Sequence, residues 1–570
     1  MIGTSQPLCA RNSTENKIVV LGNAERAQWI FFFVLLLVLR LFAARGLQIN
    51  SDEPQHLHVV WGWASGLLQY RDLFDNHSPL FQMLCAPLFR ALGERADIII
   101  PMRLAMIPLF AVCLWCVVRI GSALYPRRVA VWSAIFAGFC PVFFFKSSEF
   151  RTDDLWAALW LLALVILICR PLNSARAFCF GILVGMTFAT SLKTVLLAAS
   201  LTGGAVVVLG LRLFFRQRIN WRALAVRASL ALLGAIIVPG ALVLYFVAHH
   251  ALHEMVYCTV HYNIVPGLKR WGHFSRHVLW FPGSLPFLLA GAFFTFRFSA
   301  DVRQAARRAL ILLATGFYIT ALYSYWPDIT GEDMIPFVPL AALVIVPAVF
   351  TLFQIAATRA PALSKFAPAL PALAAALEVF VLCRSRVPWH TNTRDGIHLI
   401  ADVLRLTRPG EYVMDAKAGA IFRPRPFHYV METVARSRMK AGLLVDDSPA
   451  RMVATQTAVA VLNGLTPVAA EFVSKNYILI SRRENLCVAG KMLSPSVPGG
   501  DEYAFELAVP LQYTITSENG AVEGTMDGVA MPHDLFLQPG NHVFRRTSGS
   551  GRIALFWARA AEQGFKPVFN

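Results

Sequence analysis

The sequence is short of charged residues, and of acidic residues above all. Only 15% of its 570 residues are charged, and Asp and Glu together number 34 against 52 Lys and Arg. Soluble domains average about 25% charged residues, whereas 56% of this chain is hydrophobic. The shortage of charge excludes an ordinary soluble protein and predicts an integral membrane protein.

Three further features are missing from the chain. A cleavable signal peptide is not evident, because the first apolar run, from about Trp29, is longer than a signal core. The ten cysteines give no disulfide framework, since Cys113, Cys116 and Cys140 lie inside apolar runs and are expected to pack as small hydrophobic groups. No internal repeat of the kind that builds many transporters is visible.

The apolar residues come in blocks of about 20, the length of helix that crosses a bilayer. With the amino terminus on the positive side, the Arg-rich loops, such as 212–227 and 303–308, all fall on the cytoplasmic face. The net charge of +18 is then a topology signal and requires no nucleic acid partner. We predict roughly eleven spans, at residues 28–47, 101–124, 129–145, 154–170, 177–192, 194–213, 228–248, 278–297, 308–325, 335–356 and 367–384.

The segments between and after these spans predict the rest of the organisation. Residues 57–68 and 79–92 of the first outer loop are apolar but too short to cross, so we expect helices lying in the membrane interface. After about Arg386, short strand patterns and turns such as Asn519-Gly520 predict a soluble α/β and β-hairpin domain. The predicted domains are a cytoplasmic segment (1–27), a transmembrane domain (28–385) and an extracytoplasmic domain (386–570).

The few acids gather at the predicted outer face. Asp52 and Glu53 follow the first span, and the run Glu-Phe-Arg-Thr-Asp-Asp at 149–154 lies between two later ones. Charges beside lipid are costly unless they pair or bind something, so two such clusters at one interface predict a functional site. Each cluster also has a purely structural explanation. Asp52 and Glu53 could lie in the first turn of a helix, where acids are favoured, and residues 149–154 could form a solvated loop with a local ion pair.

A third segment, Asp75-Asn76-His77-Ser78-Pro79-Leu80, lies between these two clusters. His77 alone is most simply an ordinary loop histidine. Beside Asp75 it would be held cationic and could meet a phosphate or a sugar hydroxyl.

Taken in order, these three segments resemble the GT-C class of integral-membrane glycosyltransferases, in the branch of the protein O-mannosyltransferases and the lipid A aminoarabinose transferase. The resemblance covers roughly residues 28–340. It implies the GT-C fold and transfer of a hexosyl or pentosyl group from a polyprenyl-phosphate sugar to a glycan, lipid or protein. It makes Asp52 the catalytic base, gives Glu53 a hold on the acceptor and lets Asp153 complete the site. The residues expected to contact the acceptor or to support these groups are Asp75, Glu149, Arg151 and Asp154.

The phosphate-binding half departs from the family pattern. The family tends to carry His-Tyr or Arg-Tyr before a late span, where this chain has Glu332-Asp333, and often Lys where His77 stands. Cations for the donor phosphate must then come from elsewhere in the chain. The candidates are His77, Lys193, Lys269, Arg270 and Arg276. For each of them the alternative role is contact with lipid headgroups. A divalent metal ion held by Asp52, Glu53 and Asp153 is left open, since oxygen ligands suit Mg²⁺, Mn²⁺ or Ca²⁺.

We therefore expect an inverting glycosyltransferase of the bacterial inner membrane, monomeric or weakly oligomeric, acting on the periplasmic side. The main alternative is a transporter or flippase for a lipid-linked or anionic solute. Transporters place ionisable groups near the bilayer midplane, often in repeated halves, whereas the acids here lie at span ends. A membrane-anchored sugar-binding or scaffold protein would leave the acidic clusters without a role. In the soluble part, residues 422–429 combine aromatics and arginines that suit carbohydrate, although a structural loop is the simpler interpretation.

Overall fold

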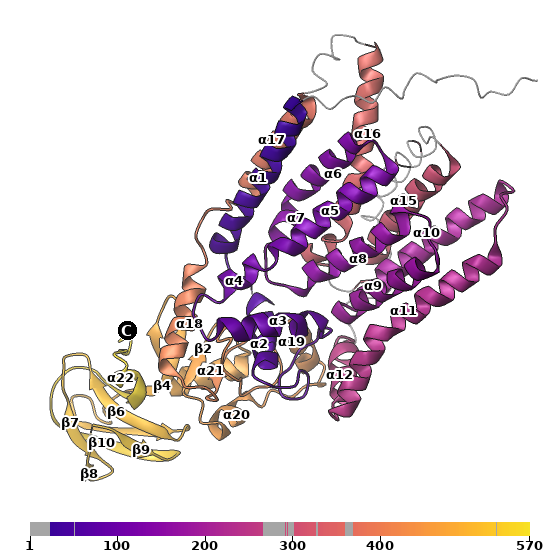
Figure 1. Ribbon diagram of the computed structural model, residues 1–570. Coiled ribbons are helices and arrows are strands. Elements are labelled where there is room, and N and C mark those ends of the chain that lie inside the picture. The colour runs from indigo at the N-terminus through magenta and orange to yellow at the C-terminus, as the bar shows by residue number, and fades with distance from the viewer. Residues whose placement is uncertain are drawn as a thin grey trace, which may run out of the picture.

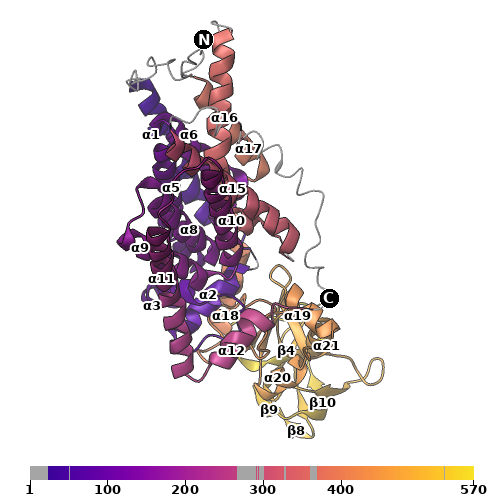
Figure 2. The ribbon, with the colours of Figure 1, turned by 90° about the vertical axis from the view of Figure 1, so that its right-hand side faces the viewer.

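The computed structural model describes residues 23–50, 52–265, 291, 293, 301–326, 329–359, 369–531 and 533–569. A bundle of long helices occupies one end, and a C-terminal domain with two β-sheets occupies the other (Figure 1). Short helices of the first loop lie between the two parts, and the view turned by 90° shows the same order along the long axis (Figure 2).

The long helices form from the apolar blocks, because a helix satisfies every backbone polar group internally. Seven helical segments among the described residues are long and apolar enough to cross a membrane, which identifies an integral membrane protein. These are α1 (Asn23–Gly46), α4 with α5 (Ile99–Leu104 and Ile107–Leu124), α8 (Thr152–Cys169), α10 (Thr194–Phe214), α11 (Trp221–Ala248), α15 (Val302–Tyr325) and α16 (Phe337–Arg359).

Three more of the predicted spans are helical but shorter. The span at 129–145 is broken into α6 (Arg127–Phe139) and α7 (Pro141–Lys146). A residue before proline avoids the helical region, and Cys140 accordingly has ψ 119°. The spans at 177–192 and 367–384 correspond to α9 (Ser174–Thr190) and α17 (Leu370–Ser385). The predicted span 278–297 lies outside the described residues, apart from Gly291 and Phe293.

Helices α9 and α11 approach so closely that glycine is needed at the contact. A Cβ atom on Gly181 would lie 2.0 Å from the Ala231 carbonyl oxygen, and one on Gly185 would lie 2.5 Å from that of Ala235. Small residues spaced four apart allow backbones to meet in this way inside membranes. This pair holds α11 to the bundle, although few of its residues are buried.

The first loop forms α2 (Asp52–Ala64) and α3 (Leu80–Leu92) at the end of the bundle that faces the C-terminal domain (Figure 1). The side chain of Asn50 accepts a hydrogen bond from the Asp52 amide at 3.1 Å, and the Glu53 carboxylate accepts one from the Asn50 amide at 2.9 Å. This reciprocal pattern caps the start of a helix. It fixes the point at which Asp52 leaves the backbone.

The C-terminal domain has the predicted mixture of helices and hairpins. Its first sheet has the order β1-β2-β4-β11-β6-β9 with β3 paired to β4, and its second has the order β5-β10-β7-β8. Among the strands that the structure describes, only β1 and β2 pair in parallel. The strands are β1 (Val413–Met414), β2 (Val459–Val461), β3 (Tyr477–Ser481), β4 (Leu486–Leu493), β5 (Glu502–Leu507), β6 (Leu511–Ser517), β7 (Glu523–Met526), β8 (Val529–Ala530), β9 (Leu535–Leu537), β10 (Gly540–Ser548) and β11 (Ile553–Trp557). The helices are α18 (Arg394–Leu406), α19 (Thr433–Lys440), α20 (Ser448–Ala454), α21 (Pro467–Asn476) and α22 (Ala558–Glu562).

The domain is docked on the first loop by polar and apolar contacts. The His58 ring nitrogen Nδ1 lies 2.8 Å from the Ile421 carbonyl oxygen, and Arg423 donates to Glu94 at 2.9 Å. Leu57 of α2 shares a buried core with Ile421 and Phe422. These contacts hold residues 421–423 of the domain against α2 and against the chain just after α3.

Candidate active site

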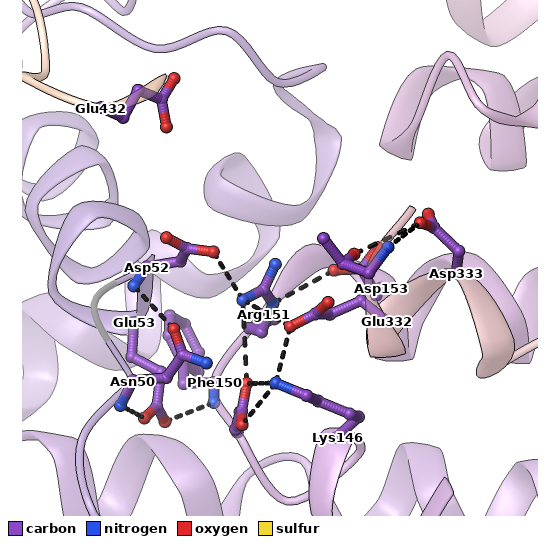
Figure 3. A network of polar contacts seen from close by, with 12 residues as sticks. Asn50, Asp52, Glu53, Lys146, Phe150, Arg151, Asp153, Glu332, Asp333 and Glu432 are labelled. Atoms are coloured by element: carbon purple, nitrogen blue, oxygen red, sulfur yellow. Dashed lines mark hydrogen bonds and ion pairs between the residues drawn. The ribbon is translucent and has the colours of Figure 1, made fainter. Parts of the chain in front are cut away.

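Charged side chains from several distant segments meet where the bundle faces the C-terminal domain, and we call this set the charged cluster (Figure 3). They come from the start of α2, the turn between α7 and α8, the start of α10, the 3₁₀ helix η2 (Gly331–Met334) and the loop after β1. Its members are Asp52, Lys146, Glu149, Arg151, Asp153, Lys193, Glu332, Asp333 and Lys417.

Arg151 is the centre of the cluster. Its Nη1 lies 2.8 Å from Asp52 Oδ2 and 3.1 Å from Glu332 Oε1. Its Nε lies 3.3 Å from Asp153 Oδ2, and Glu149 is 3.7 Å from Nη1. Burial alone would lower the pKa of Arg151, but the surrounding carboxylates outweigh it and raise the pKa. The guanidinium therefore stays charged and ties the 149–154 turn to α2 and to η2.

Asp52 is the most accessible acid among the ion pairs that surround Arg151. Its side chain is 30% exposed, whereas those of Glu149, Asp153 and Glu332 are at most 5% exposed. Burial would raise its pKa, but Arg151 and Lys417 outweigh this and hold the pKa of Asp52 well below its usual range. The cluster thus presents one ionised carboxylate toward its open side.

Glu53 is fully buried and bonded on both oxygens. Arg103 of α4 grips it with Nε at 2.7 Å and Nη2 at 2.5 Å, and the Phe150 amide donates to it at 2.8 Å. Such a bidentate pair fixes geometry as well as charge. Glu53 therefore joins α2 to α4 and to the 149–154 turn. This placement favours a positioning role over the acceptor contact expected from the resemblance.

Glu332 and Asp333, where the chain departs from the family pattern, are part of the cluster. Lys146 Nζ lies 2.8 Å from Glu332 and 3.1 Å from Glu149. Lys193 Nζ lies 2.6 Å from Asp333 and 3.8 Å from Asp153. The two acids of η2 are thus counter-charges for cations of the bundle. Reasoning from the sequence missed this role, because it treated the pair only as a lost basic contact.

His77 and Asp75 form a pair beside the cluster. His77 Nδ1 lies 2.7 Å from Asp75 Oδ1, and the other oxygen of the fully buried Asp75 accepts hydrogen bonds from Gln69 at 2.8 Å and Gln82 at 3.2 Å. Burial would lower the pKa of His77, but Asp75 outweighs it and raises the pKa. The His77 side chain is 35% exposed, so the imidazole is accessible from outside the first loop.

Two residues of the C-terminal domain also reach this region. Lys417 Nζ lies 2.7 Å from Asp52 Oδ1 and 3.9 Å from Glu432 Oε2. Glu432 also accepts a hydrogen bond from Asn76 of the first loop at 3.2 Å. Sequence reasoning missed both residues. A single lysine in the run Asp415-Ala416-Lys417-Ala418 carries no pattern that distinguishes it from a surface lysine.

Other predicted site residues lie apart from these pairs. Asp154 is 2% exposed, and its Oδ2 has no hydrogen-bond partner among the described residues. Lys269, Arg270 and Arg276 lie outside the described part of the chain.

For a metal ion, the described residues contain no suitable group of three or more His, Cys, Asp or Glu. Both oxygens of Asp52 are instead bonded to cationic groups.

The two arginines of the segment 422–429 make structural contacts. Arg423 is 2% exposed and bonds Thr407 and Glu94, while Arg425 donates to the backbone oxygens of His428 and Tyr429. Both arginines therefore hold the loop that docks on α2. The simpler interpretation of this segment, a structural loop, accounts for the contacts of both arginines.

An apolar groove runs along the bundle between α6, α16 and α17. It has a volume of about 550 Å³, and Phe337, Val349 and Phe353 of α16 line it together with Phe136 and Leu370. Its lining begins at the first residue of α16, just after η2, and continues along α16 to Ala357. A largely apolar groove thus extends along α16 from near η2, and Arg128 and Glu378 also line it.

Comparison with known proteins identifies the fold. No protein-family model and no curated protein matches the chain. The crystal structure of ArnT from Cupriavidus metallidurans in the apo state has a TM-score of 0.57 at 14% identity, over 82% of this chain and 98% of that chain. The structure of the same protein bound to undecaprenyl phosphate has a TM-score of 0.56 at 13% identity, over 81% and 97% of the two chains.

These overlays extend through the bundle and into the C-terminal part, so they concern the whole architecture and not a few helices. They confirm, at the level of fold, the resemblance that the motifs had suggested. The chain has the GT-C fold of the integral-membrane glycosyltransferases.

Proposed function

We propose that this chain transfers a sugar from a polyprenyl-phosphate carrier to an acceptor hydroxyl, with inversion at the anomeric carbon. The observation that carries the proposal is Asp52, an ionised and accessible carboxylate held at a helix start by the buried Glu53–Arg103 pair. A solved structure of the same fold holds undecaprenyl phosphate, and the apolar groove offers space for such a chain.

In the proposed reaction, the acceptor oxygen attacks the anomeric carbon while Asp52 takes the hydroxyl proton. The bond from the anomeric carbon to the phosphate oxygen breaks, and its electron pair leaves with the polyprenyl phosphate. Attack on the face opposite the phosphate inverts the configuration. The leaving phosphate gains negative charge, so it needs nearby cations more than it needs a proton.

The other residues support Asp52 in this proposal. Arg151 holds Asp52 and Asp153 in register, with Glu149 on its other side. The His77 imidazolium, oriented by Asp75, is a phosphate contact on the accessible side. The further candidates for the phosphate are Lys193, Lys269, Arg270 and Arg276, and the buried Asp154 is a supporting residue of the site.

We place the reaction at the extracytoplasmic face of a bacterial inner membrane. The charge pattern of the loops supports this orientation, because the Arg-rich loops then lie in the cytoplasm. Residues 1–27 would be cytoplasmic, 28–385 would form the catalytic membrane domain and 386–570 would lie outside. The protein would act as a monomer or weak oligomer on a glycan, lipid or protein acceptor.

The test is release of the carrier. Purified full-length protein in lipid nanodiscs is given a panel of undecaprenyl-phosphate sugars together with candidate acceptors, and free undecaprenyl phosphate is measured by mass spectrometry. Acceptor-dependent release from one donor is the expected result. If no donor is cleaved while the same lipids cross the membrane of proteoliposomes, the protein is a transporter and the proposal is wrong.

A further inference from the structure

Lys417 lies against the proposed base although it belongs to the other domain. It is separated from Asp52 by 365 residues in the sequence, and its Nζ lies 2.7 Å from the Asp52 carboxylate. The side chain is 26% exposed. The C-terminal domain therefore completes the charge environment of the base.

The cations of the cluster differ in how firmly they are held. Arg151 is 7% exposed and lies among four carboxylates, and Lys146 and Lys193 each lie between two buried ones. Lys417 is about as exposed as Lys146 and Lys193, at 26% against 25% and 23%, but its partner carboxylates, Asp52 and Glu432, are themselves 30% and 18% exposed. Its turn is anchored by Asp415, which accepts hydrogen bonds from the backbone amides of Ala418 and Ala420. A lysine on a fixed backbone can still move its ammonium group by several ångströms, because its four-carbon stem is flexible.

The position of Lys417 conflicts with the state that the reaction needs. A carboxylate bonded to two cations holds a proton poorly, since both cations favour its ionised form. To accept the acceptor proton, Asp52 must lose one of these partners. Arg151 is fixed by its other carboxylates, so Lys417 is the partner that can leave. At the same moment the departing phosphate gains charge and requires a cation.

We propose that Lys417 moves from Asp52 to the donor phosphate when the lipid-linked substrate binds. One lysine then frees the base and stabilises the leaving group, and the C-terminal domain contributes a catalytic residue to the membrane domain. This inference rests on the function proposed above. It also gives a reason for docking the C-terminal domain on the first loop.

The experiment measures binding of undecaprenyl phosphate to the full-length protein in nanodiscs, for the wild type, Lys417→Gln, Asp52→Asn and the double variant. Lys417→Gln should weaken binding by about tenfold to a hundredfold, the range for one charge-assisted hydrogen bond. Lys417→Arg should keep most of the affinity. Lys475→Gln is the matched control, because Lys475 is 66% exposed and pairs with Glu471 in the same domain.

Asp52→Asn distinguishes a moving lysine from a static one. Removing the carboxylate releases Lys417, so binding should tighten, and the gain should be much smaller in the Lys417→Gln background. An equal gain in both backgrounds, or unchanged affinity in Lys417→Gln, overturns the inference and leaves the proposed function standing. A wild-type protein that does not bind undecaprenyl phosphate overturns both.

Discussion

Replacing Arg151 with glutamine should make the protein's stability depend on pH in a new way. Arg151 lies 2.8 to 3.7 Å from the carboxylates of Asp52, Glu149, Asp153 and Glu332. Glutamine can donate a hydrogen bond to one of them but carries no charge. The variant therefore leaves several buried carboxylates without their shared cation.

The expected loss at neutral pH is about 3–5 kcal/mol in the free energy of unfolding, the cost of breaking a buried ion pair by removing one partner. Asp52 contributes the smallest share, because at 30% exposure solvent screens its charge. Most of the loss comes from Glu149, Asp153 and Glu332, which are at most 5% exposed.

The sign of the pH dependence follows from the pKa shifts. In the wild type, Arg151 helps to lower the pKa of Asp52 and Glu332, so their stabilisation is present above their ordinary values of 3.8 and 4.5 and is lost as the pH falls through the lowered values. Without Arg151, burial is opposed mainly by Lys417 at Asp52 and by Lys146 at Glu332, so the pKa of each carboxyl rises relative to the wild type. The resulting destabilisation fades as the pH falls and the carboxyls take up protons. The gap in stability between variant and wild type should therefore shrink from pH 7 to pH 5.

Thermal unfolding of the full chain, followed by tryptophan fluorescence in detergent at several pH values, measures this gap. Arg552→Gln is the control, because it removes an exposed pair with Glu518 whose side chains are 47% and 41% exposed. It should change little at any pH. A gap of equal size at pH 7 and pH 5 for Arg151→Gln would refute the reasoning.

Two further predictions concern the supporting residues. Glu53→Gln should destabilise the protein by about 3–5 kcal/mol, since it leaves buried Arg103 without its full counter-charge; unchanged thermal unfolding with a raised KM for the acceptor would instead indicate direct acceptor contact. If cationic His77 binds the phosphate, wild-type activity should fall as the pH rises through the raised pKa of His77, above the ordinary 6.5, and His77→Gln should lack this pH dependence. An identical alkaline decline in both proteins would contradict the role of His77.

The membrane half of the fold was predictable because the bilayer fixes the length of its elements. Apolar blocks of about 20 residues gave helices close to the expected bounds, and counting spans placed Asp52 and the 149–154 turn at one face, where the structure brings them into contact. The break between α6 and α7 was missed although Pro141 signals it. The hydrophobic pattern continues through this proline, so periodicity alone shows one span.

The site was only partly predictable, because its charge balance depends on contacts across hundreds of residues. Lys417 meets Asp52 through docking of the C-terminal domain, and no local pattern announces such a contact. In the sequence, Glu332 and Asp333 indicated only that a basic residue of the family pattern is missing. In the structure they pair with Lys146 and Lys193, and the spacing of these residues along the chain does not predict such pairs. The acidic site residues could be predicted because acids are rare in this sequence. Their cationic partners could be identified only from the folded structure.

The most direct test of the central claim is a single-turnover measurement on Asp52→Asn in nanodiscs, with a donor that the wild type cleaves. The amide cannot take the acceptor proton, so the rate of undecaprenyl phosphate release should fall by about a hundredfold or more. Asp52→Asn should bind undecaprenyl phosphate at least as tightly as the wild type, and its thermal unfolding should show that the site is intact. Asp501→Asn is the control, because Asp501 is 61% exposed and pairs with Arg546 in the C-terminal sheet, and it should release carrier at the wild-type rate. Release by Asp52→Asn at the wild-type rate would contradict the assignment of Asp52 as the base.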